Sequence, residues 1–230
     1  MKKLILLLMV SLTVICQEKD PNAILNQVKD KFEAVEDYTV DADIKVDVSF
    51  LQVPESHAAI YFKKPDKIKL TSEGFALLPK DGLNFSPSSL LAGEYTAIYV
   101  KKDTLKRKDV DVIKVIPDSD TIGLVLSTLW IDTNNKVVNK VEAATKKQGT
   151  ITLEFTYGNE IKYALPSSVK FFFNIGDMHL PGGIIGGMND ETSRKESKKQ
   201  PMTGSVIVNY KNYKINQGLD DSLFEEKKNN

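Results

Sequence analysis

The sequence has one cysteine, Cys16, and two histidines, His57 and His179, among 230 residues. Since Cys16 lies near the amino terminus, the rest of the chain can form neither a disulfide nor a thiol nucleophile. We assign His57 to a strand and His179 to a loop, far apart, which does not suit a histidine-rich metal site or a Ser-His-Asp triad. We therefore predict no catalytic residues, no metal and no cofactor, and a hydrophobic core as the source of stability.

Neither sign of charge is in excess, because 31 basic side chains balance 31 acidic ones. Such a balance does not predict a nucleic-acid partner. The densest basic run comprises Lys101, Lys102 and residues 106–108, and it is interleaved with Asp103 and Asp109. We interpret this run as a solvated hairpin tip.

The sequence also lacks a long hydrophobic run. The mostly apolar stretch from Leu4 to Ile15 is shorter than the roughly 20 residues of a spanning helix. It follows Met1-Lys2-Lys3 and ends at Cys16, which is typical of an export signal. We divide the chain into a signal peptide (1–16), a tether (17–21), one domain (22–224) and a polar tail (225–230). The expected location is the cell envelope, in the periplasmic space or at the outer membrane.

Two processing routes fit the end of this signal. Thr13-Val14-Ile15-Cys16 resembles a bacterial lipoprotein signal, in which the cysteine becomes the first residue and is acylated. Ile15 departs from that pattern, which normally has Gly, Ala or Ser before the cysteine. Alternatively, Val14 and Cys16 are the small-residue positions of an ordinary cleavage site, and an unanchored protein then begins at Gln17. The polar tether favours lipidation at Cys16, which would attach the domain to a membrane.

After the tether, the hydrophobic period changes from helical to extended. Asp20-Pro21 is typical of an N-cap followed by proline at the first helical position, and apolar residues recur at helical spacing to about Glu36. From Tyr38 to Phe50 apolar and polar residues alternate, which predicts a long strand of a curved antiparallel sheet. Similar segments bring the expected total to about ten strands in a meander: 57–63, 67–71, 95–101, 110–116, 123–131, 136–144, 150–157, 167–174 and 205–215.

Two segments interrupt the strands. Residues 86–93 begin with Ser86-Pro87 and end at glycine, which predicts a short apolar helix suited to a lid. The segment 176–204 carries Ile184, Ile185 and Met188 on a glycine-rich stretch, and we predict that this loop contacts a membrane. The alternative is that the loop folds back on the rim of the sheet.

This order of elements resembles the LolA/LolB/RseB superfamily of bacterial lipoprotein carriers and receptors. The likeness covers most of residues 22–224 and rests on the following segments: Ala23-Ile24-Leu25-Asn26-Gln27-Val28, Phe62-Lys63-Lys64-Pro65-Asp66, Leu129-Trp130-Ile131-Asp132, Leu165-Pro166-Ser167-Ser168-Val169 and Leu219-Asp220-Asp221-Ser222-Leu223-Phe224. The arginine with which the soluble carriers control their lid has no clear counterpart, since Arg107 and Arg194 are the only arginines.

The resemblance implies a mainly β (α+β) fold, a half-closed antiparallel β-barrel with an N-terminal helix and a short helical lid. It implies a monomer that binds lipid or lipoprotein acyl chains as a carrier or receptor; the alternative is an envelope-stress sensor or regulatory binding lipoprotein of the same fold. The expected cavity and lid residues are apolar and face inward: Val40, Ile44, Val48, Ile60, Phe62, Ile68, Leu70, Phe85, Leu90, Leu91, Ile151, Leu153 and Phe155. For each of them, membership of an ordinary packed core is the competing interpretation.

Overall fold

The computed structural model describes residues 19–48, 51–52, 54–73, 91, 93–118, 124–146, 149–174 and 203–225. The predicted signal peptide with Cys16, the lid residues Phe85 and Leu90, and the loop residues Ile184, Ile185 and Met188 lie outside these ranges, as does the side chain of Val48. In the described part of the chain, no helix has the length and apolar character that crossing a membrane requires.

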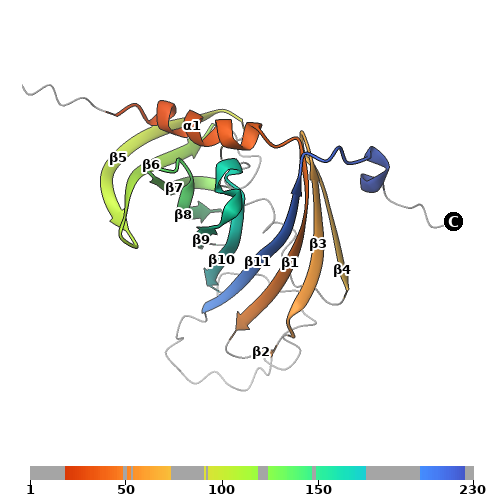
Figure 1. Ribbon diagram of the computed structural model, residues 1–230. Coiled ribbons are helices and arrows are strands. Elements are labelled where there is room, and N and C mark those ends of the chain that lie inside the picture. Colours follow the sequence, from red (N-terminus) through yellow and green to blue (C-terminus); the bar gives the residue numbers. More distant parts are fainter. Residues whose placement is uncertain are drawn as a thin grey trace, which may run out of the picture.

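An antiparallel sheet of eleven strands makes up most of the described structure, as the alternating pattern predicted (Figure 1). Its strand order is β4-β3-β1-β11-β10-β9-β8-β7-β6-β5, and β2 pairs with β1. β4 and β5 do not pair, so the sheet is a half-open barrel. The strands are β1 (Asp37–Val48), β2 (Leu51–Gln52), β3 (Ser56–Lys63), β4 (Lys67–Glu73), β5 (Tyr95–Leu105), β6 (Lys108–Pro117), β7 (Leu124–Asp132), β8 (Val138–Thr145), β9 (Gly149–Tyr157), β10 (Pro166–Asn174) and β11 (Thr203–Ile215).

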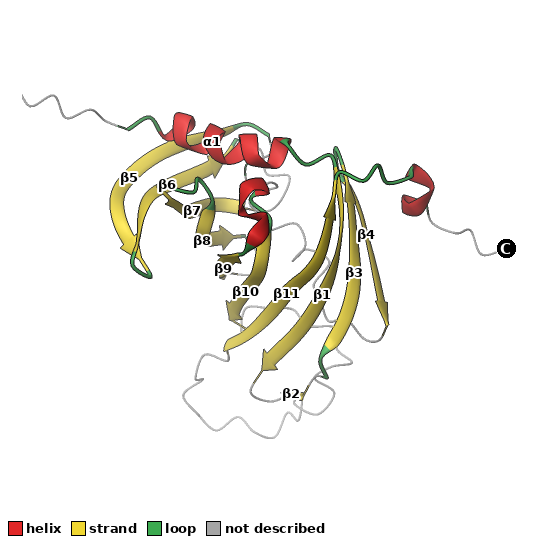
Figure 2. Ribbon diagram, in the orientation of Figure 1, coloured by secondary structure: helices red, strands yellow, loops and turns green. Residues whose placement is uncertain are grey.

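Within the described residues, three helical elements accompany the sheet (Figure 2): α1 (Pro21–Glu33) and two 3-10 helices, η2 (Asn159–Tyr163) and η4 (Asp221–Phe224). The predicted start of α1 is confirmed, because the Asp20 side chain caps the helix by accepting the N–H of Asn22 at 2.9 Å. The helix ends at Glu33, three residues before the expected Glu36, because the chain must turn to enter β1 at Asp37. The sequence patterns did not predict η2, η4 or the two-residue β2.

The main hydrophobic core lies between α1 and strands β5 to β10. Leu25 and Val28 of α1 are fully buried there, and Ile24 and Phe32 pack against the same cluster. Burying side chains of this size contributes about 1.5–3 kcal/mol each. We call the face of the sheet that α1 covers the inner face.

A second cluster occupies the other wing of the sheet, on strands β1, β3 and β11. Its buried members are Val40, Ala42, Ile44, Ala58, Ile60, Val206 and Val208. Phe171 of β10 packs against both clusters, so the inner face is apolar from one wing to the other.

The edge strand β4 is accompanied by the C-terminal η4. Lys69 donates a hydrogen bond to the carbonyl of Leu223, and Asp221 forms ion pairs with Lys63 and Lys67. Hydrogen bonds from these two lysines lower the pKa of Asp221 to about 2. Covering an edge with charged side chains and a short helix protects it from pairing with another chain.

Candidate functional site

An apolar row of cross-strand neighbours crosses eight strands on the inner face. Residues opposite each other in antiparallel strands share a face of the sheet. The row runs through Tyr99, Ile113, Leu129, Val141, Leu153, Phe171, Val206 and Val46. These residues form a continuous apolar band beneath and beside α1.

The predicted cavity residues fall into two groups on this face. Leu91, Ile151, Leu153 and Phe155 belong to the cluster under α1. Val40, Ile44 and Ile60 belong to the second cluster, against which Leu70 packs. Ile68, on the edge strand β4, is 46% exposed and is the most accessible of the described set. The structure therefore places these residues along one curved face rather than around a single point.

A second row beside the first has smaller side chains. Ala97, Val115, Ser127, Ala143 and Ile151 are successive cross-strand partners from β5 to β9. Ser127 is 2% exposed, and its hydroxyl is buried without a hydrogen-bond partner among the described residues. An unpaired hydroxyl in apolar surroundings is costly, so this position stands out from its neighbours.

Aromatic rings gather at the junction of β1, β3 and β11. Tyr38 stacks on Phe62 with 5.1 Å between ring centroids, and it meets Tyr213 edge-on at 5.8 Å. Tyr210 lies 6.1 Å from Tyr213. Burial raises the pKa of Tyr38 to about 12, and it raises the pKa values of Tyr210 and Tyr213 as well. These phenols are therefore neutral at physiological pH and add apolar area to the inner face.

The amino-terminal end of α1 is held by a buried carboxylate. Lys19 Nζ lies 2.6 Å from Oδ1 of Asp111, and the Tyr99 hydroxyl donates to the same oxygen at 3.2 Å. Asp111 is 2% exposed and lies on β6, two residues before the inward-facing Ile113. Desolvation, followed by the charge of Asp111, raises the pKa of Tyr99. Further along the helix, Lys29 lies 4.8 Å from the ring centroid of Tyr95.

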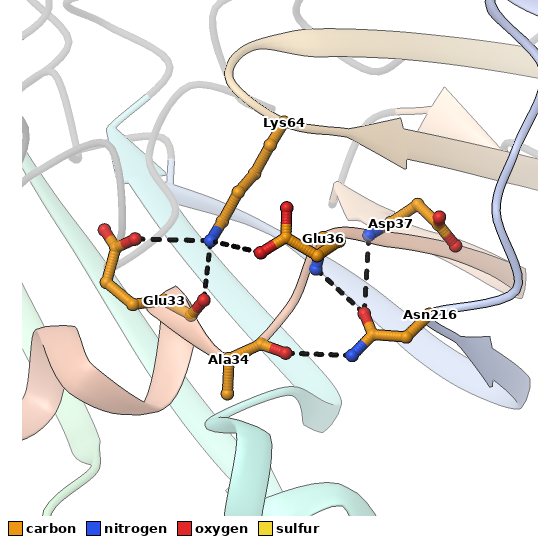
Figure 3. A network of polar contacts seen from close by, with 6 residues as sticks. All are labelled: Glu33, Ala34, Glu36, Asp37, Lys64 and Asn216. Atoms are coloured by element: carbon orange, nitrogen blue, oxygen red, sulfur yellow. Dashed lines mark hydrogen bonds and ion pairs between the residues drawn. The ribbon is translucent and has the colours of Figure 1, made fainter.

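The carboxyl-terminal end of α1 is held by a denser network (Figure 3). The Asn216 side chain accepts the N–H of Glu36 at 2.8 Å and donates to the carbonyl of Ala34 at 2.9 Å. Lys64 donates to the carbonyl of Glu33 at 2.6 Å and forms ion pairs with Glu33 and Glu36 at 3.2 Å. Helix, first strand and C-terminal segment are thus joined at one point.

The buried Asp37 strengthens the same junction. Its carboxylate accepts the backbone N–H groups of Gln217 and Gly218, both at 2.8 Å, and of Leu219 at 3.2 Å. The start of β1 is thereby tied to the segment that follows β11.

The described residues contain no group of three His, Cys, Asp or Glu side chains suited to a metal ion. His57 lies in β3, as expected, and its Nδ1 is 2.7 Å from Asp43 Oδ1 on the exposed side of the sheet. Hydrogen bonds from Lys211 and then His57 lower the pKa of Asp43. The basic run near residue 106 is the β5–β6 hairpin tip, where Lys101 pairs with Asp103 and Lys102 with Asp109.

No protein-family model matches the sequence, and no curated protein matches it. Solved structures do match its shape. A DUF1329 family protein from Desulfovibrio piger aligns over 90% of this chain and 98% of its own, with a TM-score of 0.57 and 11% identity. A LolA superfamily protein from Nitrosomonas europaea aligns over 91% and 99%, with a TM-score of 0.56 and 10% identity. A putative outer membrane lipoprotein-sorting protein domain from Vibrio parahaemolyticus aligns over 88% and 94%, with a TM-score of 0.55 and 15% identity.

The chain has the LolA-like fold. The predicted half-closed antiparallel barrel with an N-terminal helix is therefore confirmed by both the strand order and these structures, whereas the helical lid stays a prediction. Two residues of the inner face, Asp111 and Ser127, and the lysine that pairs with Asp111, Lys19, are not among the predicted site residues. For Asp111 the alternation shows only that the carboxylate shares a face with Ile113 and Val115, and the structure is needed to show that this face is the inner one.

Proposed function

We propose that this LolA-like protein binds the acyl chains of lipids or lipoproteins on its inner face, in the cell envelope. The observation that carries the proposal is the apolar row across eight strands, partly covered by α1, in a sheet whose end strands β4 and β5 do not pair with each other. The similarity to a putative outer membrane lipoprotein-sorting domain supports the same class of ligand.

The composition of the inner face makes the apolar chain the main source of affinity. Each methylene transferred from water contributes about 0.8 kcal/mol, so about ten buried methylenes give roughly 8 kcal/mol before binding costs. Without those costs this energy would correspond to a Kd of about 1 micromolar, which is therefore the tightest binding that ten methylenes alone can give. Recognition by apolar area and shape suits a protein that releases its cargo again.

The two attachments of α1 suggest how the inner face is reached. One partly buried ion pair, Lys19 with Asp111, holds its first end, whereas Asn216 and Lys64 hold the other end through several bonds. The helix therefore opens from its Lys19 end and pivots near residues 34–37. Phe85, Leu90 and Leu91 remain the proposed lid residues.

A binding assay with matched substitutions on β5 tests the proposal. Ala97 faces the inner cluster, while its neighbour Ile98 is 47% exposed. Phenylalanine at position 97 fills space beside the apolar row, so Ala97→Phe is expected to weaken binding of a fluorescent fatty-acyl probe about tenfold. Ile98→Phe introduces the same ring on the other face and leaves binding unchanged. Equal affinities for the two variants would contradict the proposed site.

The role of Cys16 decides whether the protein acts as a tethered receptor or as a diffusing carrier. We favour acylation at Cys16, which anchors the domain beside a membrane. Metabolic labelling with a fatty acid is expected to mark the wild-type protein and to be lost in Cys16→Ala. Label and membrane attachment that persist in the variant would refute this anchor. The proposed membrane contacts Ile184, Ile185 and Met188 are tested by the same fractionation after their replacement with serine.

A further inference from the structure

Ser127 is the one polar side chain in the row of small residues on the inner face. Its cross-strand neighbours are Val115 on β6 and Ala143 on β8, and both belong to the core cluster beneath α1. Its hydroxyl has no hydrogen-bond partner in the described structure, although the residue is 2% exposed. Buried hydroxyls are nearly always paired, so this one calls for an explanation.

The surroundings of Ser127 restrict what could pair with it. The adjacent row is made of large apolar residues, including Ile113, Leu129 and Val141. The row of Ser127 contains the small side chains of Ala97 and Ala143 instead. Small side chains in one row leave room against the inner face when α1 moves away. A group entering there meets apolar atoms on most sides and a single hydroxyl donor.

These features favour a neutral carbonyl over a charged head group. A carboxylate would lose its hydration in this apolar row and gain only one hydroxyl donor, which does not compensate for burying a charge. Two lysines lie over this part of the face: Lys19 is paired with Asp111, and Lys29 lies against the Tyr95 ring. Asp111 and Val115 are four residues apart on β6, so Asp111 lies about 13 Å along the strand from the Ser127 level.

We propose that Ser127 donates a hydrogen bond to the ester carbonyl of a bound acyl chain. The inference rests on the proposed acyl-chain binding and adds the position of the ester to it. The ester carbonyl would supply the hydrogen-bond acceptor that the Ser127 hydroxyl lacks in the closed protein. The acyl chain would lie along the row of large apolar residues. Membrane diacylglycerol lipids and the diacylglyceryl group of lipoproteins both carry this ester.

Competition with a fluorescent acyl probe tests the inference on the full mature protein. The competitors are methyl palmitate, which has the ester, and octadecane, which has a similar length and no carbonyl. Ser127→Ala is expected to weaken methyl palmitate binding about tenfold and to leave octadecane binding unchanged. Ser127→Thr keeps the hydroxyl and restores the preference for the ester.

Thr133→Val is the matched control, because Thr133 carries the other buried hydroxyl without a partner in the described chain. It lies in the β7–β8 turn, next to Asp132, and its removal should alter neither affinity. Ser127→Ala should also fold at least as stably as wild type, since it removes an unpaired buried hydroxyl. A lower melting temperature in Ser127→Ala would show that the hydroxyl is paired within the closed protein and would contradict the inference.

The outcomes separate the two levels of the proposal. If wild type binds neither competitor nor probe, acyl-chain binding itself is wrong. If wild type binds both and Ser127→Ala keeps its preference for the ester, only the role of Ser127 is wrong. Comparing diacylglycerol with a synthetic diacylglyceryl-cysteine peptide then shows whether the bound ester comes from a membrane lipid or from a lipoprotein. A preference for either ligand supports the inference if Ser127→Ala weakens that preference.

Discussion

Lys19 and Asp111 form an ion pair, with 2.6 Å between Nζ and Oδ1, that joins the start of α1 to the inner face of β6. The carboxylate is buried, whereas the lysine side chain is 43% exposed. Water can therefore reach one partner and compete for it, which makes this the weaker of the two attachments of the helix. Lys19 also lies three residues after Cys16 in the sequence. A lipid attached to Cys16 would therefore be close to this ion pair.

Removing the lysine should destabilise the protein more than removing both partners. Among the described residues, Lys19→Ala leaves the buried carboxylate with the Tyr99 hydroxyl as its one side-chain partner, at an expected cost of about 1–3 kcal/mol in the free energy of unfolding. Adding Asp111→Asn to that variant should restore part of the loss, because the unpaired charge is gone. A double-mutant cycle by urea unfolding measures the coupling. Coupling near zero would show that the pair does not hold α1.

Asn216 is expected to act through both its side chain and its backbone. Its φ of 56° lies in the left-handed region, which alanine adopts at a cost and glycine adopts freely. Asn216→Ala should lower the free energy of unfolding by about 2 kcal/mol, and Asn216→Gly by about 1 kcal/mol less than that. Chemical denaturation of the two variants gives this difference. Indistinguishable variants would mean that the side-chain hydrogen bonds carry the whole effect.

The aromatic junction predicts a loss of stability in alkali. The pKa of Tyr38 is raised from 10.0 to about 12 by burial, so the folded state holds its proton more tightly than the unfolded chain does. The contribution of protonated Tyr38 to the free energy of unfolding is complete below pH 10 and is lost as the pH rises from 10 to about 12. Unfolding free energies over this range should fall less in Tyr38→Phe, which has no proton to lose. A parallel decline in the variant would exclude Tyr38 as a cause.

Asp132 predicts an opposite dependence in acid. Its burial alone would raise the pKa, but hydrogen bonds from Asn135 and Asn134 and the charge of Lys108 outweigh burial and lower it. The stability from this carboxylate is present above the unfolded pKa and is lost as the pH falls through the lowered folded value. Asp132→Ala should cost about 2 kcal/mol at neutral pH, because the turn N–H groups lose their acceptor. Urea unfolding at neutral pH and below pH 4 should show the gap to wild type narrowing in acid; an unchanged gap would contradict this role.

The strands could be predicted because alternation is a local property of the sequence. The stretch beginning at Tyr38 shows apolar and polar residues in turn, and the structure places β1 there at Asp37–Val48. The cap at Asp20 is equally local. The pairing of β1 with β11 joins Tyr38 to Ile215, and no short-range pattern indicates so distant a partner.

The site residues were harder to predict because both faces of some strands are buried. On β6 the consecutive residues Val110, Asp111, Val112 and Ile113 are all buried, so alternation does not tell which of them face inward. Ser127 is a small polar residue in a strand, and only the register with Val115 and Ala143 shows that it joins the core. Lys19 belongs to the predicted polar tether, and no local pattern indicates its pairing with Asp111, 92 residues away.

Native mass spectrometry of the protein purified from its own envelope tests the central claim most directly. The account predicts a measured mass greater than that of the polypeptide plus any acyl groups attached covalently at Cys16. Collisional activation should then release the excess mass as an acyl-bearing species. Ala97→Phe should carry less of this species than Ile98→Phe, prepared in the same way. A wild-type protein that is free of acyl species, and that takes up none when incubated with envelope lipid, would contradict acyl-chain binding on the inner face.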